Sequence, residues 1–268
     1  MDPLPRAAVA FTGGKDSILA LHLVTAAFNH HLPSTEQLTP VILVSFQPRD
    51  SPENFKAHSQ PWTRLLAQSL GLPLITKHIA APFAQSYHTA IKELHSDHQV
   101  TRLVTGDILD IGEGFMDRAS ENTGVELVRP LWNLPRTQVL DLLAALRIEY
   151  IVTLTHLEKI PQAVSNKLLG KPITREYLLE QFDWYDAEYA TDVRNSVDWA
   201  GEYGEMHSMV VDCPMFSCRV VHSGSQTAVQ VTPYGSYCYL VPDAINMLPK
   251  DVSAQPPHAE LFLAPRHS

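Results

Sequence analysis

Short apolar runs alternate with segments of helical spacing over the first 155 or so residues. The runs predict five strands, at residues 7–11, 41–46, 74–79, 103–105 and 149–154. Helices are predicted after residue 17 and over residues 54–70, 82–95, 115–123 and 137–146. This alternation predicts an α/β fold with a parallel five-stranded sheet and helices on both faces.

The pattern changes beyond residue 155. Residues 161–195 are polar with helical spacing, and residues 206–241 hold short β-rich runs separated by proline, glycine and serine. These features predict a smaller α+β part at the C-terminal end. We therefore expect a first domain over residues 1–155, a second over residues 156–242, and a loose, proline-containing tail over residues 243–268.

Composition narrows the class of protein. The chain has 268 residues, 45% of them hydrophobic and 18% charged, which is typical of a globular protein with a sizeable core. The net charge of -9 argues against stable binding of a long nucleic acid. The first residues lack a basic segment followed by an apolar one, and no run approaches the roughly 20 apolar residues of a membrane span. We expect a cytoplasmic protein with no membrane partner.

The three cysteines, Cys213, Cys218 and Cys238, form no C-x-x-C pair. An odd and sparse set argues against a disulfide framework and against a thiolate metal cage. We expect three reduced thiols.

The first apolar run is followed at once by a six-residue loop, Thr12, Gly13, Gly14, Lys15, Asp16 and Ser17. Consecutive glycines let backbone N–H groups converge on an anion. The two hydroxyls add donors, the lysine adds a positive charge, and the helix that follows offers its N-terminal dipole. The aspartate suits Mg²⁺ or a structural partner. The pattern therefore predicts a phosphate site, and the alternative is a corner rich in glycine for steric reasons.

A second polar segment falls on the same edge of the predicted sheet. The first strand ends at Thr12, and the fourth ends at Gly106 and Asp107. Ligands of parallel sheets bind beyond the carboxyl ends of the strands. Asp107 is therefore a second candidate ligand for Mg²⁺, beside Asp16.

The loop lacks the spacing of a Walker A motif. It resembles instead the S-G-G-x-D-S signature of the PP-loop ATP pyrophosphatases, with Thr12 in place of the first serine. That resemblance implies a fold of the adenine nucleotide alpha-hydrolase type. It also implies cleavage of ATP between its α- and β-phosphates, with formation of an adenylate.

Three further segments resemble the diphthine–ammonia ligase family. They are G-D-I at residues 106–108, P-L-W at 130–132, and G-E-Y-G-E-M-H-S at 201–208 followed by D-C-P-M-F at 212–216. The resemblance implies an AMP-forming amide ligase that uses ATP and Mg²⁺ to adenylate a carboxylate, which ammonia or an amine then attacks. The implied acceptor is diphthine on elongation factor 2, and a small carboxylic acid of specialised metabolism is the alternative.

The resemblance also implies roles for individual residues. Lys15, Asp107, Glu202 and Glu205 are the implied catalytic residues, and Gly106 joins the loop in binding ATP. The two glutamates would hold ammonium and take its proton. Four residues could contact the substrate: His58, Arg118, Glu121 and Trp132. Core packing is the alternative for the tryptophan, and a surface position is the alternative for the histidine.

Two other classes of function stay open. A tRNA-modifying PP-loop enzyme is disfavoured by the negative net charge and, for sulfur transfer, by cysteines that all lie beyond residue 212 without a C-x-x-C pair. A non-catalytic nucleotide-binding protein is disfavoured because Lys15, Asp16, Asp107 and both glutamates are intact. A mobility shift with tRNA would support the first class, and ATP binding without turnover would support the second.

Overall fold

The first sheet of the computed structural model is entirely parallel. The structure describes residues 5–25, 38–49 and 58–250. The strands of this sheet are β1 (Arg6–Ala10), β2 (Thr39–Pro48), β3 (Leu74–Ile79), β4 (Arg102–Val104) and β5 (Glu126–Val128). Their order is β3-β2-β1-β4-β5, so the direction of winding reverses between β1 and β4. A ligand of such a sheet binds at this reversal.

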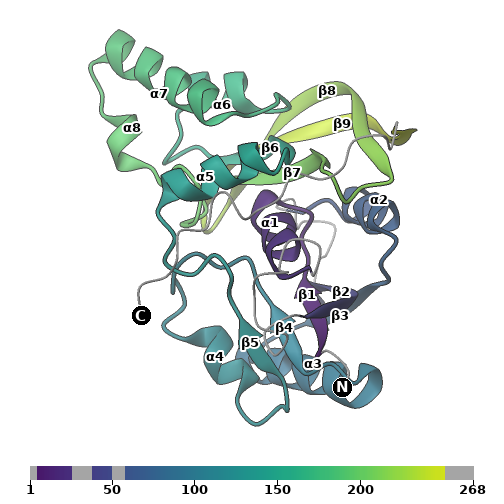
Figure 1. The fold of residues 1–268 in the computed structure, drawn as a ribbon. Coiled ribbons are helices and arrows are strands. Elements are labelled where there is room, and N and C mark those ends of the chain that lie inside the picture. Colours follow the sequence, from purple (N-terminus) through teal and green to yellow (C-terminus); the bar gives the residue numbers. More distant parts are fainter. Residues whose placement is uncertain (1–4, 26–37, 50–57, 251–268) are drawn as a thin grey trace.

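Helices cover both faces of the parallel sheet (Figure 1). One face carries α1 (Lys15–Val24) and α2 (Gln60–Leu70), and the other carries α3 (Phe83–His98) and α4 (Phe115–Ser120). On the second face, Ile91 and Leu94 of α3 pack in one core with Val44 and Leu103 of the sheet. Burial of these apolar side chains stabilises the layer.

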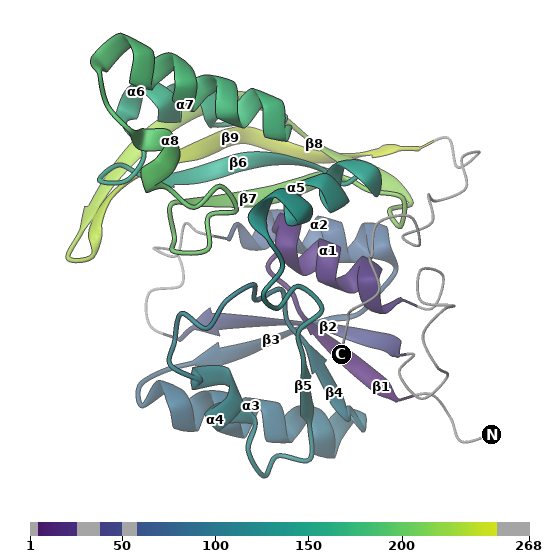
Figure 2. The same ribbon diagram turned by 60° about the vertical axis from the view of Figure 1, so that its left-hand side comes forward.

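A second, antiparallel sheet lies on the far side of α1 and α2. Its strands, in spatial order, are β7 (Met206–Asp212), β6 (Glu149–His156), β9 (Gly235–Pro249) and β8 (Cys218–Thr232). The accompanying helices are α5 (Arg136–Ala145), α6 (Gln162–Leu168), α7 (Arg175–Tyr189) and α8 (Val193–Ser196). Figure 2 shows α1 and α2 between the two sheets, with α6 and α7 on the outer face of the antiparallel one. One core includes Leu19, Leu66 and Met209, so the two parts pack tightly.

The predicted fold class is confirmed, but one strand was assigned to the wrong sheet. Residues 149–154 do form a strand, yet this strand, β6, pairs antiparallel with β7 and β9. The fifth parallel strand is β5, which has three residues and pairs with β4. An apolar run such as that of β6 fits the interior of either sheet, and a three-residue strand gives too short a pattern to recognise.

The end of the chain also differs from the prediction. Instead of becoming loose at residue 243, strand β9 continues to Pro249, where it pairs with Cys218 of β8. Pairing with a long neighbour holds these residues in a strand despite their prolines. Residues 251–268 of the predicted tail lie outside the described part, and the domain limits stay a prediction.

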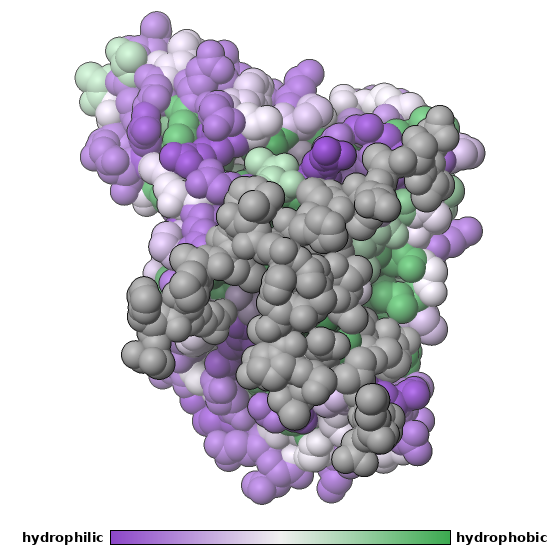
Figure 3. Space-filling model, viewed as in Figure 1, coloured by the Kyte–Doolittle hydropathy of each residue, from purple (hydrophilic) through white to green (hydrophobic). Residues whose placement is uncertain are grey.

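Polar side chains dominate the described surface in Figure 3, most clearly over α7 and α8. Within residues 5–25, 38–49 and 58–250, no helix has both the length and the apolar character that a membrane span requires. The apolar residues are instead gathered between the layers.

The buried histidine of α1 gives a test of this packing. His22 is 0% exposed, and its Nδ1 lies 2.8 Å from the carbonyl oxygen of Ile18. Burial lowers its pKa from 6.5 to about 4. The unfolded chain therefore takes up a proton here at a higher pH than the folded protein does, and stability falls as the pH drops from 6.5 towards 4.

We expect His22 to account for a loss of about 2 kcal/mol in the free energy of unfolding between pH 7 and pH 5. Urea denaturation at the two pH values measures this loss. A His22→Leu variant should lose about 2 kcal/mol less than the wild type over the same interval. Equal losses in the two proteins would show that His22 protonates as readily in the folded state as in the unfolded one.

Candidate functional site

Hydrogen bonds between residues close in sequence fix the backbone of the loop between β1 and α1. The N–H of Gly14 donates to Thr12 Oγ1 over 3.2 Å, and Ser17 Oγ donates to the Gly14 carbonyl over 2.9 Å. Gly13 has a φ of +79°, and a Cβ there would lie 2.7 Å from Leu66 Cδ1. Gly14 is the N-cap of α1 and provides no side-chain cap. The helix therefore presents N-terminal N–H groups at the loop, as a phosphate site requires.

The antiparallel sheet contacts this loop through hydrogen bonds. The N–H of Val210 donates to the Gly13 carbonyl over 2.9 Å, and the N–H of Lys15 donates to Ser208 Oγ over 3.2 Å. Both partners belong to β7. The motif at residues 201–208 is thus brought to the loop from nearly two hundred residues away. Ser208 is the last residue of that motif, and the sequence analysis gave it no contact with the loop.

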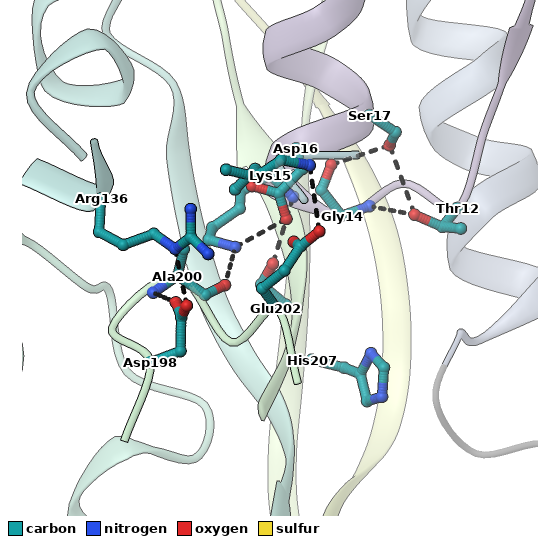
Figure 4. Close-up of polar contacts among 12 residues, drawn as sticks. Thr12, Gly14, Lys15, Asp16, Ser17, Arg136, Asp198, Ala200, Glu202 and His207 are labelled. Atoms are coloured by element: carbon teal, nitrogen blue, oxygen red, sulfur yellow. Dashed lines mark hydrogen bonds and ion pairs between the residues drawn. The ribbon is translucent and has the colours of Figure 1, made fainter. Parts of the chain in front are cut away.

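The side chain of Lys15 is buried and points towards the turn that precedes β7. Its Nζ lies 2.7 Å from Asp16 Oδ2 and donates to the Ala200 carbonyl over 2.5 Å (Figure 4). Only 4% of the residue is exposed. An ammonium group has three donors, and hydrogen bonds among the described residues use two of them, which leaves one that could serve a ligand.

Asp198 fixes the backbone beneath this lysine. Its Oδ1 accepts from the N–H of Ala200 over 2.8 Å, and its Oδ2 accepts from Arg136 Nε over 2.7 Å. Figure 4 shows Arg136 reaching Asp198 beside the Lys15–Ala200 contact. The sequence analysis missed both residues, because no spacing rule connects the start of α5 with a turn 62 residues later.

The two glutamates of the G-E-Y-G-E segment differ in their surroundings. Glu202 reaches the segment after β4, where its Oε1 accepts from the N–H groups of Ile108 and Leu109 over 3.0 and 3.1 Å. Burial raises the pKa of Glu202. Glu205 is 4% exposed, and its Oε2 accepts from the N–H of Tyr203 over 3.0 Å. Glu202 therefore joins two site segments, whereas Glu205 holds its own turn together.

The polar segment after β4 lies beside the loop, as expected from the strand ends. Strands β1 and β4 are parallel neighbours, and a Cβ on Gly106 would lie 2.7 Å from the backbone carbon of Asp16. Asp107 Oδ2 accepts from Thr105 Oγ1 over 2.7 Å and lies 3.8 Å from Arg129 Nε. Burial raises the pKa of Asp107, and the charges of Asp117 and Asp16 add to this effect.

The predicted substrate residues of the segment at 115–132 fall into two groups. The guanidinium carbon of Arg129 lies 4.3 Å from the ring centre of Trp132, and the same side chain lies beside Asp107, so the tryptophan adjoins the site. Arg118 instead donates to the carbonyl of Glu113 near the start of its own helix. Glu121 is exposed at the C-terminal end of α4. Contact of these two residues with substrate stays a prediction.

His58 packs against His207 of β7. Their ring centres are 5.1 Å apart in an edge-to-face arrangement. Burial lowers the pKa of His58 to about 3 and that of His207 to about 4, and the charge of Lys15 also lowers the latter. Both imidazoles are therefore neutral at pH 7. The structure places His58 next to the motif segment, and its contact with a ligand stays a prediction.

The cysteines carry no metal or disulfide chemistry in the described structure. All three are free thiols. Burial raises the pKa of Cys213 to about 12, so this thiol stays protonated at neutral pH and is a poor nucleophile.

The carboxylates fit Mg²⁺ that is shared with a nucleotide. Asp16 Oδ1 is buried and has no hydrogen-bond partner among the described residues. Within the same residues, no group of three or more histidine, cysteine, aspartate or glutamate side chains could hold a metal ion by itself. Mg²⁺ is commonly held by one or two carboxylates together with phosphate oxygens. Asp16, with Asp107 nearby, is suited to that arrangement.

The direction of winding of the parallel sheet reverses between β1 and β4, and a loop rich in glycines and hydroxyls lies at this point. These two features define a nucleotide-binding α/β protein of the PP-loop type. The family model for the diphthamide synthase N-terminal domain matches residues 5–127, and the model for the C-terminal domain of the same synthase matches residues 155–232. The chain belongs to the diphthamide synthase family. Membership in this family indicates a ligase.

Two solved structures are similar at low identity. A predicted tRNA methyltransferase subunit from Methanocaldococcus jannaschii has 14% identity and a TM-score of 0.37, covering 78% of this chain and 98% of that one. The U34-tRNA thiolase NcsA from Methanococcus maripaludis, with its [4Fe-4S] cluster, has 12% identity and a TM-score of 0.36, covering 74% and 71%. No curated protein sequence matches the chain.

Proposed function

We propose that this protein is an ATP-dependent, AMP-forming amide ligase that joins ammonia to a carboxylate. One observation carries the proposal: the loop Thr12–Ser17, the segment after β4 and Glu202 meet at one edge of the parallel sheet. In this proposal the loop would bind phosphate, Asp16 and Asp107 would hold Mg²⁺, and Glu202 would be a further carboxylate beside them. Family membership supports the same reading.

The residues of the loop would bind and orient the nucleotide. The N-terminal N–H groups of α1 and the free donor of Lys15 would hold phosphate oxygens, while Asp16 and Asp107 would hold Mg²⁺. Bound ATP supplies the AMP group that activates the carboxylate, with release of pyrophosphate. The fixed positive charge of Lys15 would stabilise the negative charge that develops on the departing phosphates.

Glu202 would bind ammonium and accept its proton. Its carboxylate is fixed by two backbone N–H groups and approaches Lys15 and Asp16 closely enough for their charges to affect its pKa. Burial raises the pKa of Glu202, which makes the group a better proton acceptor than a solvated carboxylate. Glu205, hydrogen-bonded within its turn, would keep this segment in shape.

A Glu202→Gln variant tests this role. The amide keeps the acceptor oxygen but removes the charge and the basic site, so we expect the KM for ammonium to rise and the rate of amide formation to fall by about 100-fold. Pyrophosphate release and amide formation, measured over a range of ammonium concentrations, give both values. Glu126→Gln, on an exposed strand residue, is the matched control. An unchanged KM for ammonium in Glu202→Gln would rule out the role.

The acceptor distinguishes two versions of the function. Purified protein with Mg²⁺-ATP and ammonium is offered elongation factor 2 that carries diphthine, or a panel of small carboxylic acids, and pyrophosphate release is measured. Release that requires the factor supports amidation of diphthine. Release with a small acid alone supports a ligase of specialised metabolism. Absence of release with every acceptor, in protein that binds ATP, would contradict both versions.

A further inference from the structure

Lys15 is held by a chain of contacts that begins on a distant helix. Arg136, at the start of α5, donates from Nε to Asp198 Oδ2 over 2.7 Å. The other carboxylate oxygen of Asp198 accepts from the N–H of Ala200 over 2.8 Å. The carbonyl of Ala200 in turn accepts from Lys15 Nζ over 2.5 Å. Each contact fixes the position of the next group along the chain.

We propose that Asp198 and Arg136 are positioning residues for the loop lysine, and that they set how tightly the site holds ATP. The inference rests on the proposed function, because its consequence is measured on nucleotide binding. The hydrogen bonds and the ion pair of these two side chains go to Leu134, to Ala200 and to each other rather than to the loop. They act through the Ala200 carbonyl, which determines the direction in which the Lys15 ammonium points.

Burial makes this chain of contacts rigid. The side chain of Asp198 is 8% exposed and that of Arg136 is 20% exposed, so solvent weakens their pairing little. The turn that follows is also closely packed. Gly201 has a φ of +76°, and a Cβ there would lie 2.7 Å from the Met206 carbonyl oxygen. Ala200 therefore lies between a hydrogen bond to Asp198 and a closely packed glycine.

The chain of contacts also explains how Lys15 can serve a phosphate while buried. Asp16 takes one of its donors and Ala200 takes another. With two of its three hydrogens fixed in direction, the third points in a defined direction. Without the Ala200 contact, the ammonium would keep only Asp16 and would be free to turn. A flexible lysine loses more conformational entropy on binding a phosphate, which weakens the complex.

A double-mutant cycle separates positioning from simple stabilisation of the turn. Asp198→Asn keeps the size and one acceptor oxygen but loses the charged contact with Arg136. We expect it to weaken Mg²⁺-ATP binding, measured by calorimetry, by about 10-fold in the wild-type background. In the Lys15→Ala background we expect almost no further effect, since the lysine that Asp198 positions is gone. Equal weakening in both backgrounds would overturn the proposal.

The control variant disrupts an ion pair of the same type at another place in the chain. Asp141 pairs with Arg175 at 2.8 Å on the exposed side of α5, and Asp141→Asn should leave ATP binding unchanged. Arg136→Lys, which retains the charge, should restore part of the affinity that Arg136→Ala loses. Thermal unfolding of every variant identifies any that fails to fold, and Arg136→Ala then replaces Asp198→Asn in the cycle.

A second measurement does not need ATP. Reaction of Lys15 with an amine-specific reagent is followed by mass spectrometry, with Lys77 of the same chain as the internal reference. We expect Asp198→Asn to raise the labelling rate of Lys15 at least threefold relative to Lys77. Failure of the wild type to bind ATP would contradict the proposed function but leave this result standing. An unchanged labelling ratio would contradict the positioning role itself.

Discussion

Replacing Lys15 with alanine should reduce ATP-dependent pyrophosphate release by at least about 100-fold. The ammonium group is buried, fixed by Asp16 and Ala200, and adjoins the N-terminus of α1. Its loss removes the positive charge that would face the departing phosphates. It also leaves the Asp16 carboxylate without its partner at 2.7 Å, which further disfavours an incoming anion. Pyrophosphate release under saturating acceptor and ammonium measures the effect.

The appropriate control is a partly buried, ion-paired lysine outside the site. Lys77 on β3 is 16% exposed and pairs with Glu93 at 2.6 Å. Lys77→Ala should lose stability comparable to the loss in Lys15→Ala and keep wild-type pyrophosphate release. If Lys15→Ala retained more than about a tenth of the wild-type rate while folding normally, the lysine could not be the phosphate-binding cation of this site.

The strand, loop and helix around the proposed phosphate site were predictable because their signals are local. An apolar run, two glycines, flanking hydroxyls and a following helix stand within a dozen residues, and the structure places them as strand, loop and helix. The position of Gly106 and Asp107 was predictable for a different reason. Ends of parallel strands share an edge, so the assignment of the two strands was enough to bring both segments together.

The rest of the site depends on contacts that no local pattern encodes. Asp198 and Arg136 meet across 62 residues, and Ser208 meets Lys15 across 193. The distinct surroundings of Glu202 and Glu205 are also a tertiary property. They are three residues apart in one turn, and only the approach of the segment after β4 makes one of them bridge two segments. The membership of β6 in the second sheet could not be read from its apolar run either.

Gly106→Ala should damage the site without removing any functional group. An added Cβ would lie 2.7 Å from the carbonyl carbon of Asp16 and 2.9 Å from its oxygen and from the Ser17 nitrogen. These are backbone atoms at the start of α1, so relief of the overlap must displace the loop itself. We expect a loss of about 1–3 kcal/mol in the free energy of unfolding. ATP affinity, measured by calorimetry, should fall at least about 10-fold because the N–H groups proposed to bind phosphate move.

Gly71→Ala separates this steric effect from the general effect of replacing a glycine. Gly71 ends α2 with a φ of +67°, and an added Cβ there would meet nothing within 4 Å. Its replacement should cost about 1 kcal/mol of stability, from backbone strain alone, and leave ATP affinity unchanged. If Gly106→Ala bound ATP as tightly as Gly71→Ala, the close packing of the segment after β4 on the loop would have no part in nucleotide binding. The nucleotide site would then consist of the loop and α1, without the segment after β4.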